Sequence, residues 1–121
     1  MPSYRAPLRD HRFVLNELLN VQQYNNIEGF SEATPDIIDA VLEEGGKFCE
    51  NVLYPLNKVG DRQGCKLKSD GEVEVPEGFA DAYTQFTEGG WTAISGDPKY
   101  GGQGLPEYVG LAMGEMITSS N

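Results

Sequence analysis

The sequence predicts an all-α fold of about four helices, with a short hairpin or extended excursion near residues 65–75. Three observations lead to this fold class. Apolar residues recur every three or four positions in four separate segments. Proline opens three of these segments, and glycine or asparagine follows them, as expected at helix ends. Alternation of apolar and polar residues is confined to the stretch 65–75. The chain of 121 residues is long enough for one domain with a self-supporting core.

The first helix is expected over residues 8–24. Leucine, phenylalanine and valine recur there at helical spacing, and asparagine, glutamate and glutamine side chains lie on the opposite side. Asn25 and Asn26, followed by Gly29, provide a stop and a turn.

The second helix has the clearest signals. Thr34 is a natural N-cap, and Pro35 fits the first helical position. From Ile38 to Leu56 an apolar stripe then repeats at helical spacing over about five turns. Such a stripe predicts that one side of this helix is buried against a neighbour.

Two features conflict with a regular second helix. Gly45-Gly46 is unfavourable in a helix interior by about 1 kcal/mol per residue relative to alanine, which suggests close approach by a neighbouring helix. Pro55 lacks a backbone donor and should kink or end the helix locally. Gly60 and Asp61 are expected to mark the far boundary.

A hairpin and a third helix are expected next. Asp70-Gly71 is the pair most favoured in a two-residue hairpin turn. Pro76 then opens the third helix, and Gly89-Gly90 closes it. One face of this helix carries three aromatic residues, Phe79, Tyr83 and Phe86.

The glycine-rich stretch 95–104 allows two interpretations. Backbone amides before a helix can cradle a phosphate, but the dinucleotide fingerprint fails here because Glu107 stands where its third glycine belongs. We therefore favour a tight connection with several glycines at positive φ. Pro106 opens the last helix, whose apolar side we expect to be largely unpartnered. Its residues are Val109, Met113 and Met116.

The charge of the chain excludes some function classes. Nine basic residues stand against nineteen acidic ones, a net charge of -10, which disfavours nucleic acids and anionic membranes. Apolar runs are too short to span a bilayer and signal-peptide features are lacking, so a cytoplasmic protein is expected. Three arginines, Arg5, Arg9 and Arg12, make the N-terminal arm basic. Whether this arm docks or stays solvated is left open.

Side chains able to bind a metal or act as a nucleophile are sparse. Cys49 and Cys65 lack metal-site spacing, and His11 is the single histidine, expected to be a polar surface residue. No metal site is therefore expected. Glu115, in an apolar helix, is expected to be buried and paired within the domain. The aromatic side chains of Tyr83, Phe86 and Trp91 are expected in the core.

Two stretches carry a family resemblance. Gly90-Trp91 followed by Tyr100-Gly101-Gly102-Gln103-Gly104-Leu105 resembles the acyl-CoA dehydrogenases, in which this stretch links two helices of the N-terminal helical domain. Tyr4-Arg5-Ala6-Pro7-Leu8-Arg9-Asp10 is similar to the N-terminal extension of the large bacterial-type branch, which includes the 3-methylthiopropionyl-CoA dehydrogenases. The resemblance implies an extension with one helix over residues 1–30. It also implies a helical domain over 31–121 that is truncated at its C-terminal end.

The resemblance also implies a function. Family members oxidise acyl-CoA to 2-enoyl-CoA, using FAD held between a middle β domain and a C-terminal helical domain. Their catalytic glutamate lies in the C-terminal part, so Glu115 is not expected to be the base. No catalytic or cofactor-binding residue is expected in this chain. It should be inactive alone, without bound FAD, and its partners should be the remaining domains and further copies.

By position in the family pattern, four residues are candidates for the wall of the acyl pocket: Met116, Ser119, Ser120 and Asn121. An alternative function involves no catalysis. In it, the chain is a stand-alone acidic helical module for interaction or dimerisation.

Overall fold

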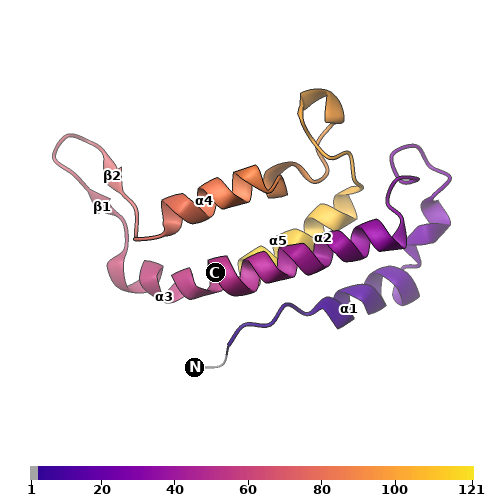
Figure 1. The fold of residues 1–121 in the computed structure, drawn as a ribbon, viewed down its shortest axis with the longest axis horizontal. Coiled ribbons are helices and arrows are strands. Elements are labelled where there is room, and N and C mark those ends of the chain that lie inside the picture. The colour runs from indigo at the N-terminus through magenta and orange to yellow at the C-terminus, as the bar shows by residue number, and fades with distance from the viewer. Residues whose placement is uncertain (1–2) are drawn as a thin grey trace.

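The fold is all-α, as predicted, with one two-stranded ribbon (Figure 1). It is seen in a computed structural model that describes residues 3–121. The helices are α1 (Leu8–Arg12), α2 (Pro35–Phe48), α3 (Tyr54–Gln63), α4 (Phe79–Glu88) and α5 (Glu107–Ser120). The strands are β1 (Lys66–Leu67) and β2 (Val73–Glu74). In Figure 1, α2 and α3 form one long helix, with α1 along one side and α4 along the other.

The N-terminal helix is shorter than predicted. After α1 it continues as a wider π-helical segment, Phe13–Leu18, and it ends before Asn20, whose φ of 46° is left-handed. A 3-10 turn, Val21–Tyr24, follows. The prediction of a helix to residue 24 is therefore wrong at its end. Asparagine tolerates the left-handed conformation, and the resulting turn directs Val21 into the core.

The long second helix begins as predicted but ends later. The Thr34 hydroxyl accepts a hydrogen bond from the Ile37 amide at 3.4 Å, and Pro35 is the first helical residue. Before Pro55 the helix widens into a π segment, Cys49–Leu53, and then continues as α3. The proline thus changes one turn without ending the helix. The predicted boundary at Gly60 is wrong, because α3 runs to Gln63 and ends at Gly64, whose φ is 60°.

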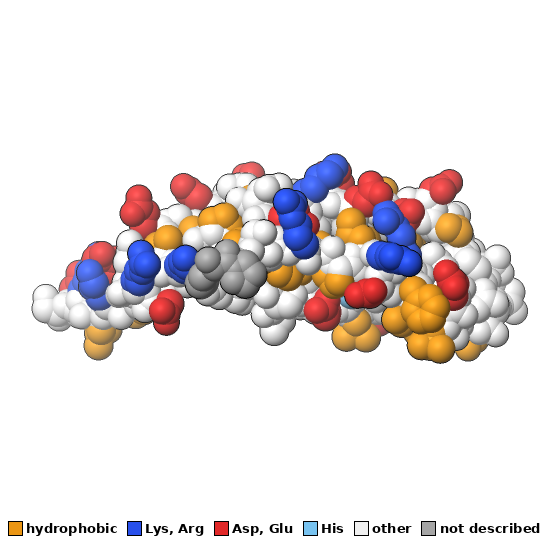
Figure 2. All heavy atoms as spheres, turned by 90° about the horizontal axis from the view of Figure 1, so that it is seen from below, with side chains coloured by type: hydrophobic (Ala, Val, Ile, Leu, Met, Phe, Trp, Pro, Cys, Tyr) orange, Lys and Arg blue, Asp and Glu red, His pale blue; other side chains and the backbone are white. Residues whose placement is uncertain are grey.

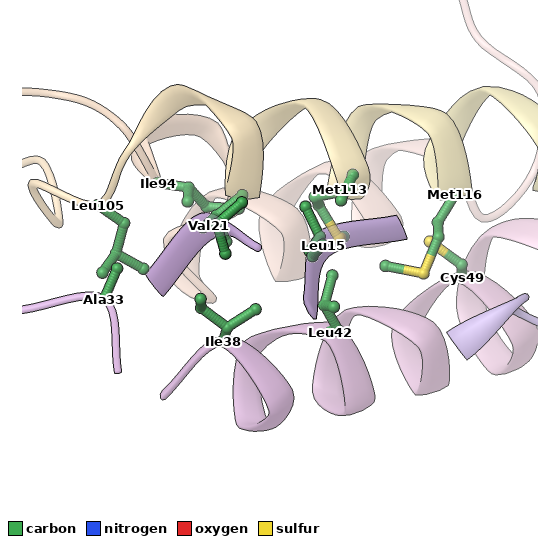
Figure 3. Packing of buried hydrophobic residues seen from close by; sticks show 12 residues of the cluster. Leu15, Val21, Ala33, Ile38, Leu42, Cys49, Ile94, Leu105, Met113 and Met116 are labelled. Carbon is green, nitrogen blue, oxygen red and sulfur yellow. The ribbon is translucent and has the colours of Figure 1, made fainter. Parts of the chain in front are cut away.

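The core lies where α5 packs along α2, with the N-terminal segment covering one side (Figure 3). A Cβ on Gly45 would lie 2.5 Å from the sulfur of Met113, and one on Gly46 would lie 2.9 Å from the Cβ of Ala6. The predicted close approach at the glycine pair is thus confirmed, by α5 at one glycine and by the arm at the other. The expectation of an unpartnered last helix is wrong, because its apolar face is fully buried in this core. These residues are Val109, Met113 and Met116.

The ribbon is a hairpin in which Leu67 pairs with Val73. Its turn differs from the predicted two-residue type, since the Lys68 amide donates to the Glu72 carbonyl at 2.8 Å and Gly71 takes a φ of 90°. Three residues, 69–71, therefore form the loop, which ends in a left-handed glycine. The apolar side chains of the hairpin are exposed.

The glycine-rich stretch is a tight connection, as predicted. Gly101 and Gly104 have φ values of 89° and 67°. A Cβ on Gly102 would collide with the backbone carbonyl of Gly96. This part of the loop therefore requires glycine both for backbone conformation and for space.

Alanine substitutions should separate these two kinds of glycine. We expect Gly102→Ala to lower the free energy of unfolding by about 2 kcal/mol, because backbone atoms must move to accept the methyl group. Gly114→Ala is the control. Its Cβ would have no described atom within 4 Å, and helix propensity should raise the stability by up to about 1 kcal/mol. Urea unfolding measures both, and equal effects of the two substitutions would contradict the packing described.

Candidate functional site

The four predicted pocket residues lie at the last turn of α5, but they face different ways. Met116 is buried beside Cys49 (Figure 3), and Ser120 is buried with a hydrogen bond to the same cysteine. Burial raises the pKa of the Cys49 thiol, and a hydrogen bond with Ser120 opposes that rise. Ser119 lies on the exposed side of the helix. Asn121 lies on a third side, where its side-chain amide donates to a backbone carbonyl of the long helix, so the four residues do not form one surface.

Asn121 lines an apolar groove of about 260 Å³ between the long helix, α4 and the end of α5. Its amide donates to the carbonyl of Leu53 at 2.8 Å, which holds the chain end at the groove. The aromatic face of α4 supplies one wall. The lining residues are Leu53, Leu56, Phe79, Ala82, Tyr83, Phe86, Ile117 and Asn121.

The aromatic residues of α4 only partly follow the prediction of a core role. Phe86 stacks on Phe48, with ring centroids 6.1 Å apart, and Trp91 stacks on the same ring at 6.3 Å. Tyr83 is 66% exposed, so its assignment to the core is wrong. Its ring instead forms an edge of the groove. Apolar spacing indicated both walls, since Leu53 and Leu56 belong to the stripe of the second helix, but no local signal showed that the two helices lie side by side.

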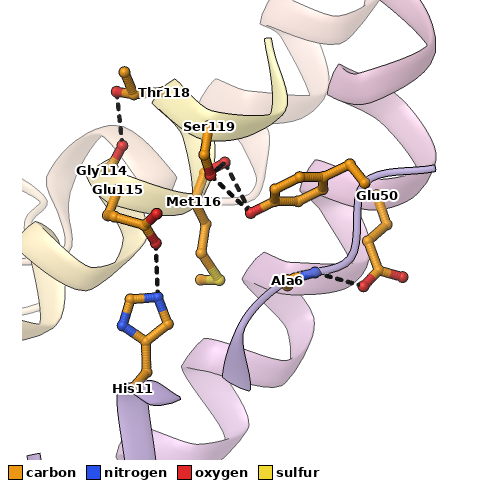
Figure 4. A network of polar contacts seen from close by, with 9 residues as sticks. Ala6, His11, Glu50, Gly114, Glu115, Met116, Thr118 and Ser119 are labelled. Carbon is orange, nitrogen blue, oxygen red and sulfur yellow. Dashed lines mark hydrogen bonds and ion pairs between the residues drawn. The ribbon is translucent and has the colours of Figure 1, made fainter. Parts of the chain in front are cut away.

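The N-terminal arm is docked on its own domain (Figure 4). The Tyr4 hydroxyl donates to the carbonyl of Met116 at 3.2 Å and accepts from the Ser119 hydroxyl at 3.0 Å. Burial raises the pKa of the Tyr4 phenol. The Ala6 amide donates to the Glu50 carboxylate at 2.9 Å. Sequence reasoning missed Tyr4, whose contact across more than a hundred residues no local pattern could show.

Charges complete the docking. Arg12 donates to Asp39 at 2.7 Å and to Glu43 at 2.6 Å. The hydrogen bond to Asp39 raises the pKa of the Arg12 guanidinium. Figure 2 shows basic and acidic side chains interspersed on the face that carries this arm. The question left open by the sequence is thus answered in favour of docking.

Glu115 is paired within the domain, as predicted, but it is not buried. Its side chain is 50% exposed, and its carboxylate lies 2.9 Å from Nε2 of His11 (Figure 4). The expectation of a buried glutamate is wrong, since α5 turns this residue toward the arm. The prediction that His11 is a polar surface residue is also wrong, because its side chain is only 16% exposed. Within residues 3–121, histidine, cysteine and acidic side chains do not gather in a group able to hold a metal.

The glycine-rich loop uses its own backbone donors. The amides of Gln103, Gly104 and Leu105 donate to carbonyls of residues 93–96 at 2.8–3.0 Å. Earlier in the loop, the Lys99 amide donates to the Asp97 carboxylate at 2.8 Å. A phosphate cradle needs such donors directed at the ligand, so this loop does not fit a flavin phosphate.

The chain is similar to known proteins along its whole length. It is 39% identical over 119 residues to a 3-methylmercaptopropionyl-CoA dehydrogenase of Ruegeria pomeroyi, covering 98% of this chain and 20% of that protein. It is 33% identical over 91 residues to a butyryl-CoA dehydrogenase of Syntrophomonas wolfei, covering 73% of the chain and 15% of that protein. The chain belongs to the acyl-CoA dehydrogenase family.

A third relative and two further findings complete the comparison. A broad-specificity linear acyl-CoA dehydrogenase of Mycobacterium tuberculosis is 29% identical over 122 residues, covering all of this chain and 20% of that protein. No family model matches the chain. The chain spans about a fifth of the length of the curated relatives from Ruegeria and Mycobacterium. Among the described residues, every helix is too short or too polar to cross a membrane.

The docked arm should contribute to stability through Arg12. We expect Arg12→Gln to lower the free energy of unfolding by about 1 kcal/mol at low salt, with a smaller effect in 1 M NaCl because both ion pairs are partly solvated. Arg9→Gln is the control, since the described residues give Arg9 no ion pair. Chemical unfolding at two salt concentrations measures both. Equal loss for the two substitutions would contradict the docking.

The two cysteines should differ in reactivity. Cys65 is exposed and Cys49 is buried, and burial raises the pKa of Cys49, which lowers the fraction of reactive thiolate. We expect a maleimide to modify Cys65 in the native protein at least about 100-fold faster than Cys49, with both reacting in urea. Peptide mass spectrometry identifies the sites. Comparable native rates would show that the α2–α5 core opens.

Proposed function

We propose that this chain is the N-terminal helical domain of a longer FAD-dependent acyl-CoA dehydrogenase, whose complete form oxidises acyl-CoA to 2-enoyl-CoA. One observation carries the proposal: 98% of the chain matches a 3-methylmercaptopropionyl-CoA dehydrogenase, while covering only 20% of it. Residues 1–30 are the extension and residues 31–121 the helical domain. The remaining domains of the protein, its acyl-CoA substrate and further copies are its partners in this proposal.

The role proposed for this part is scaffold and one wall of the acyl pocket. The last turn of α5 is held from three sides, by Tyr4, Cys49 and the carbonyl of Leu53. Ser119 and Asn121 have accessible side chains, but on different sides of α5, so each would contribute to the pocket wall at a separate place. Met116 and Ser120 would support the wall from within the core.

The chemistry itself is assigned to the rest of the protein. Removing a proton next to a thioester requires a positioned carboxylate, hydrogen-bond donors on the carbonyl and a flavin that accepts the hydride. Glu115 is paired with His11, away from the apolar groove, and the amides of the glycine-rich loop are used internally. We therefore propose that the isolated chain neither binds FAD nor oxidises acyl-CoA.

An alternative function is kept because of one observation. The groove exposes apolar and aromatic side chains, Tyr83 among them, and such surfaces mark interaction sites. A stand-alone acidic helical module would bury this groove in a dimer.

The enzymatic proposal is tested with the full-length gene product. We expect it to purify with a flavin spectrum that bleaches when acyl-CoA is added anaerobically, whereas residues 1–121 alone show neither flavin nor turnover. Glu115→Gln in the full-length protein should keep kcat/KM within about twofold, because the base lies elsewhere. A full-length protein without flavin bleaching, or turnover by residues 1–121, would contradict the proposal.

A further inference from the structure

We infer that Tyr4 of the N-terminal arm is a specificity-determining positioning residue, which turns the Ser119 hydroxyl away from a hollow that holds the acyl chain. This inference rests on the proposed function, because that function places Ser119 in the wall of the acyl pocket. It gives the docked arm a part in substrate choice, and it places the acyl chain on the Ser119 side of α5.

The hollow lies on the exposed side of α5 and has a volume of about 480 Å³. Three of its lining residues have polar side chains, and two of these are engaged elsewhere (Figure 4). The Thr118 hydroxyl donates to the carbonyl of Gly114 at 2.9 Å, and the Glu115 carboxylate pairs with His11. Ser119 is the third, so its orientation decides how polar this surface is. The lining residues are Gly110, Leu111, Gly114, Glu115, Thr118 and Ser119.

Tyr4 accepts the proton of the Ser119 hydroxyl. Ser119 donates to the Tyr4 hydroxyl at 3.0 Å, and its contact with the carbonyl of Met116 is longer, at 3.3 Å. The Tyr4 hydroxyl in turn donates to the carbonyl of Met116 at 3.2 Å, and burial raises its pKa, so it stays protonated. Both hydroxyl protons are thus used within the protein. An apolar chain in the hollow therefore buries neither of them without a partner, which would be unfavourable.

The arm is attached to the body on the C-terminal side of Tyr4 as well. The Ala6 amide donates to the Glu50 carboxylate at 2.9 Å. Further along the arm, Nε2 of His11 lies 2.9 Å from the carboxylate of Glu115, one helical turn before the contact of Tyr4 with α5. The arm therefore contacts α5 at two successive turns, which fixes Tyr4 beside the hollow.

Loss of the Tyr4 hydroxyl should make the hollow more polar. Ser119 would keep only the longer contact with the carbonyl of Met116, and its hydroxyl could turn toward the hollow. A hydroxyl in that orientation either holds a water molecule or is buried by the chain without a partner, and both disfavour an apolar substrate. A long acyl chain covers more of the hollow than a short one, so it should lose more affinity.

The test compares tyrosine variants of the full-length enzyme on the longest and the shortest straight-chain acyl-CoA that it oxidises. In Tyr4→Phe we expect the ratio of kcat/KM for the long chain over the short chain to fall at least about threefold. The fall should come from KM, with kcat within about twofold, because the contact lies away from the reacting atoms. Tyr24→Phe is the control, since it removes the hydroxyl of another tyrosine of the extension whose ring packs on Phe30. It should leave the ratio unchanged.

A double-mutant cycle shows whether Tyr4 acts through Ser119. Ser119→Ala breaks the same hydrogen bond but leaves no hydroxyl to turn, so alone it should keep the ratio at or above the wild-type value. Adding Tyr4→Phe to Ser119→Ala should then change nothing further. A threefold fall in Ser119→Ala alone, or an equal effect of Tyr4→Phe in both backgrounds, would overturn the inference.

Thermal unfolding separates this role from a purely structural one. A Tyr4→Phe enzyme with a lower Tm and an unchanged ratio would also overturn the inference. Such an enzyme, if it still shows flavin bleaching by acyl-CoA, leaves the proposed function intact. A full-length protein without flavin bleaching contradicts the proposed function, and this inference with it.

Discussion

The close contact at Gly45-Gly46 is the constraint on which the rest of the structure depends. The missing side chains let Met113 of α5 settle on Gly45 and let Ala6 of the arm settle on Gly46. Helix propensity disfavours both glycines, so their presence in the middle of α2 is explained by packing. Because α5 is set against α2 at this point, its last turn lies within reach of Tyr4 on one side and of the long helix on the other.

The position of that last turn, more than any reactive group, is what this part of the protein contributes. The side chains that might have suggested chemistry are engaged in structure: Glu115 with His11, and the loop amides with nearby carbonyls. Membership of the acyl-CoA dehydrogenase family accounts for such an arrangement, since the matched region is a fifth of the relatives' length. The apolar groove beside Asn121 is a surface of the kind that packs against other protein.

Much of the fold could be predicted because its signals are local. The Thr34 cap, the glycine turns and the hairpin depend on neighbouring residues, and they were found where expected. Two local details still differ, because the first helix ends before Asn20 and the hairpin loop has three residues. The other failures depend on distant contacts. Gly60 remains helical with a ring of Phe79 against it, and Glu115 faces an arm about a hundred positions earlier. The apolar stripes of the two helices predicted the walls of the groove, but their pairing depends on a contact between distant segments. The roles of Met116, Ser119, Ser120 and Asn121 in an acyl pocket stay predictions.

The central claim is that this chain is the first part of a longer acyl-CoA dehydrogenase. The most direct measurement is the nucleotide sequence of the gene beyond the codon for Asn121. The account predicts that the reading frame continues into a β domain and a second helical domain that carries a glutamate base. A stop codon directly after Asn121 would contradict it and would leave the acidic interaction module as the better explanation.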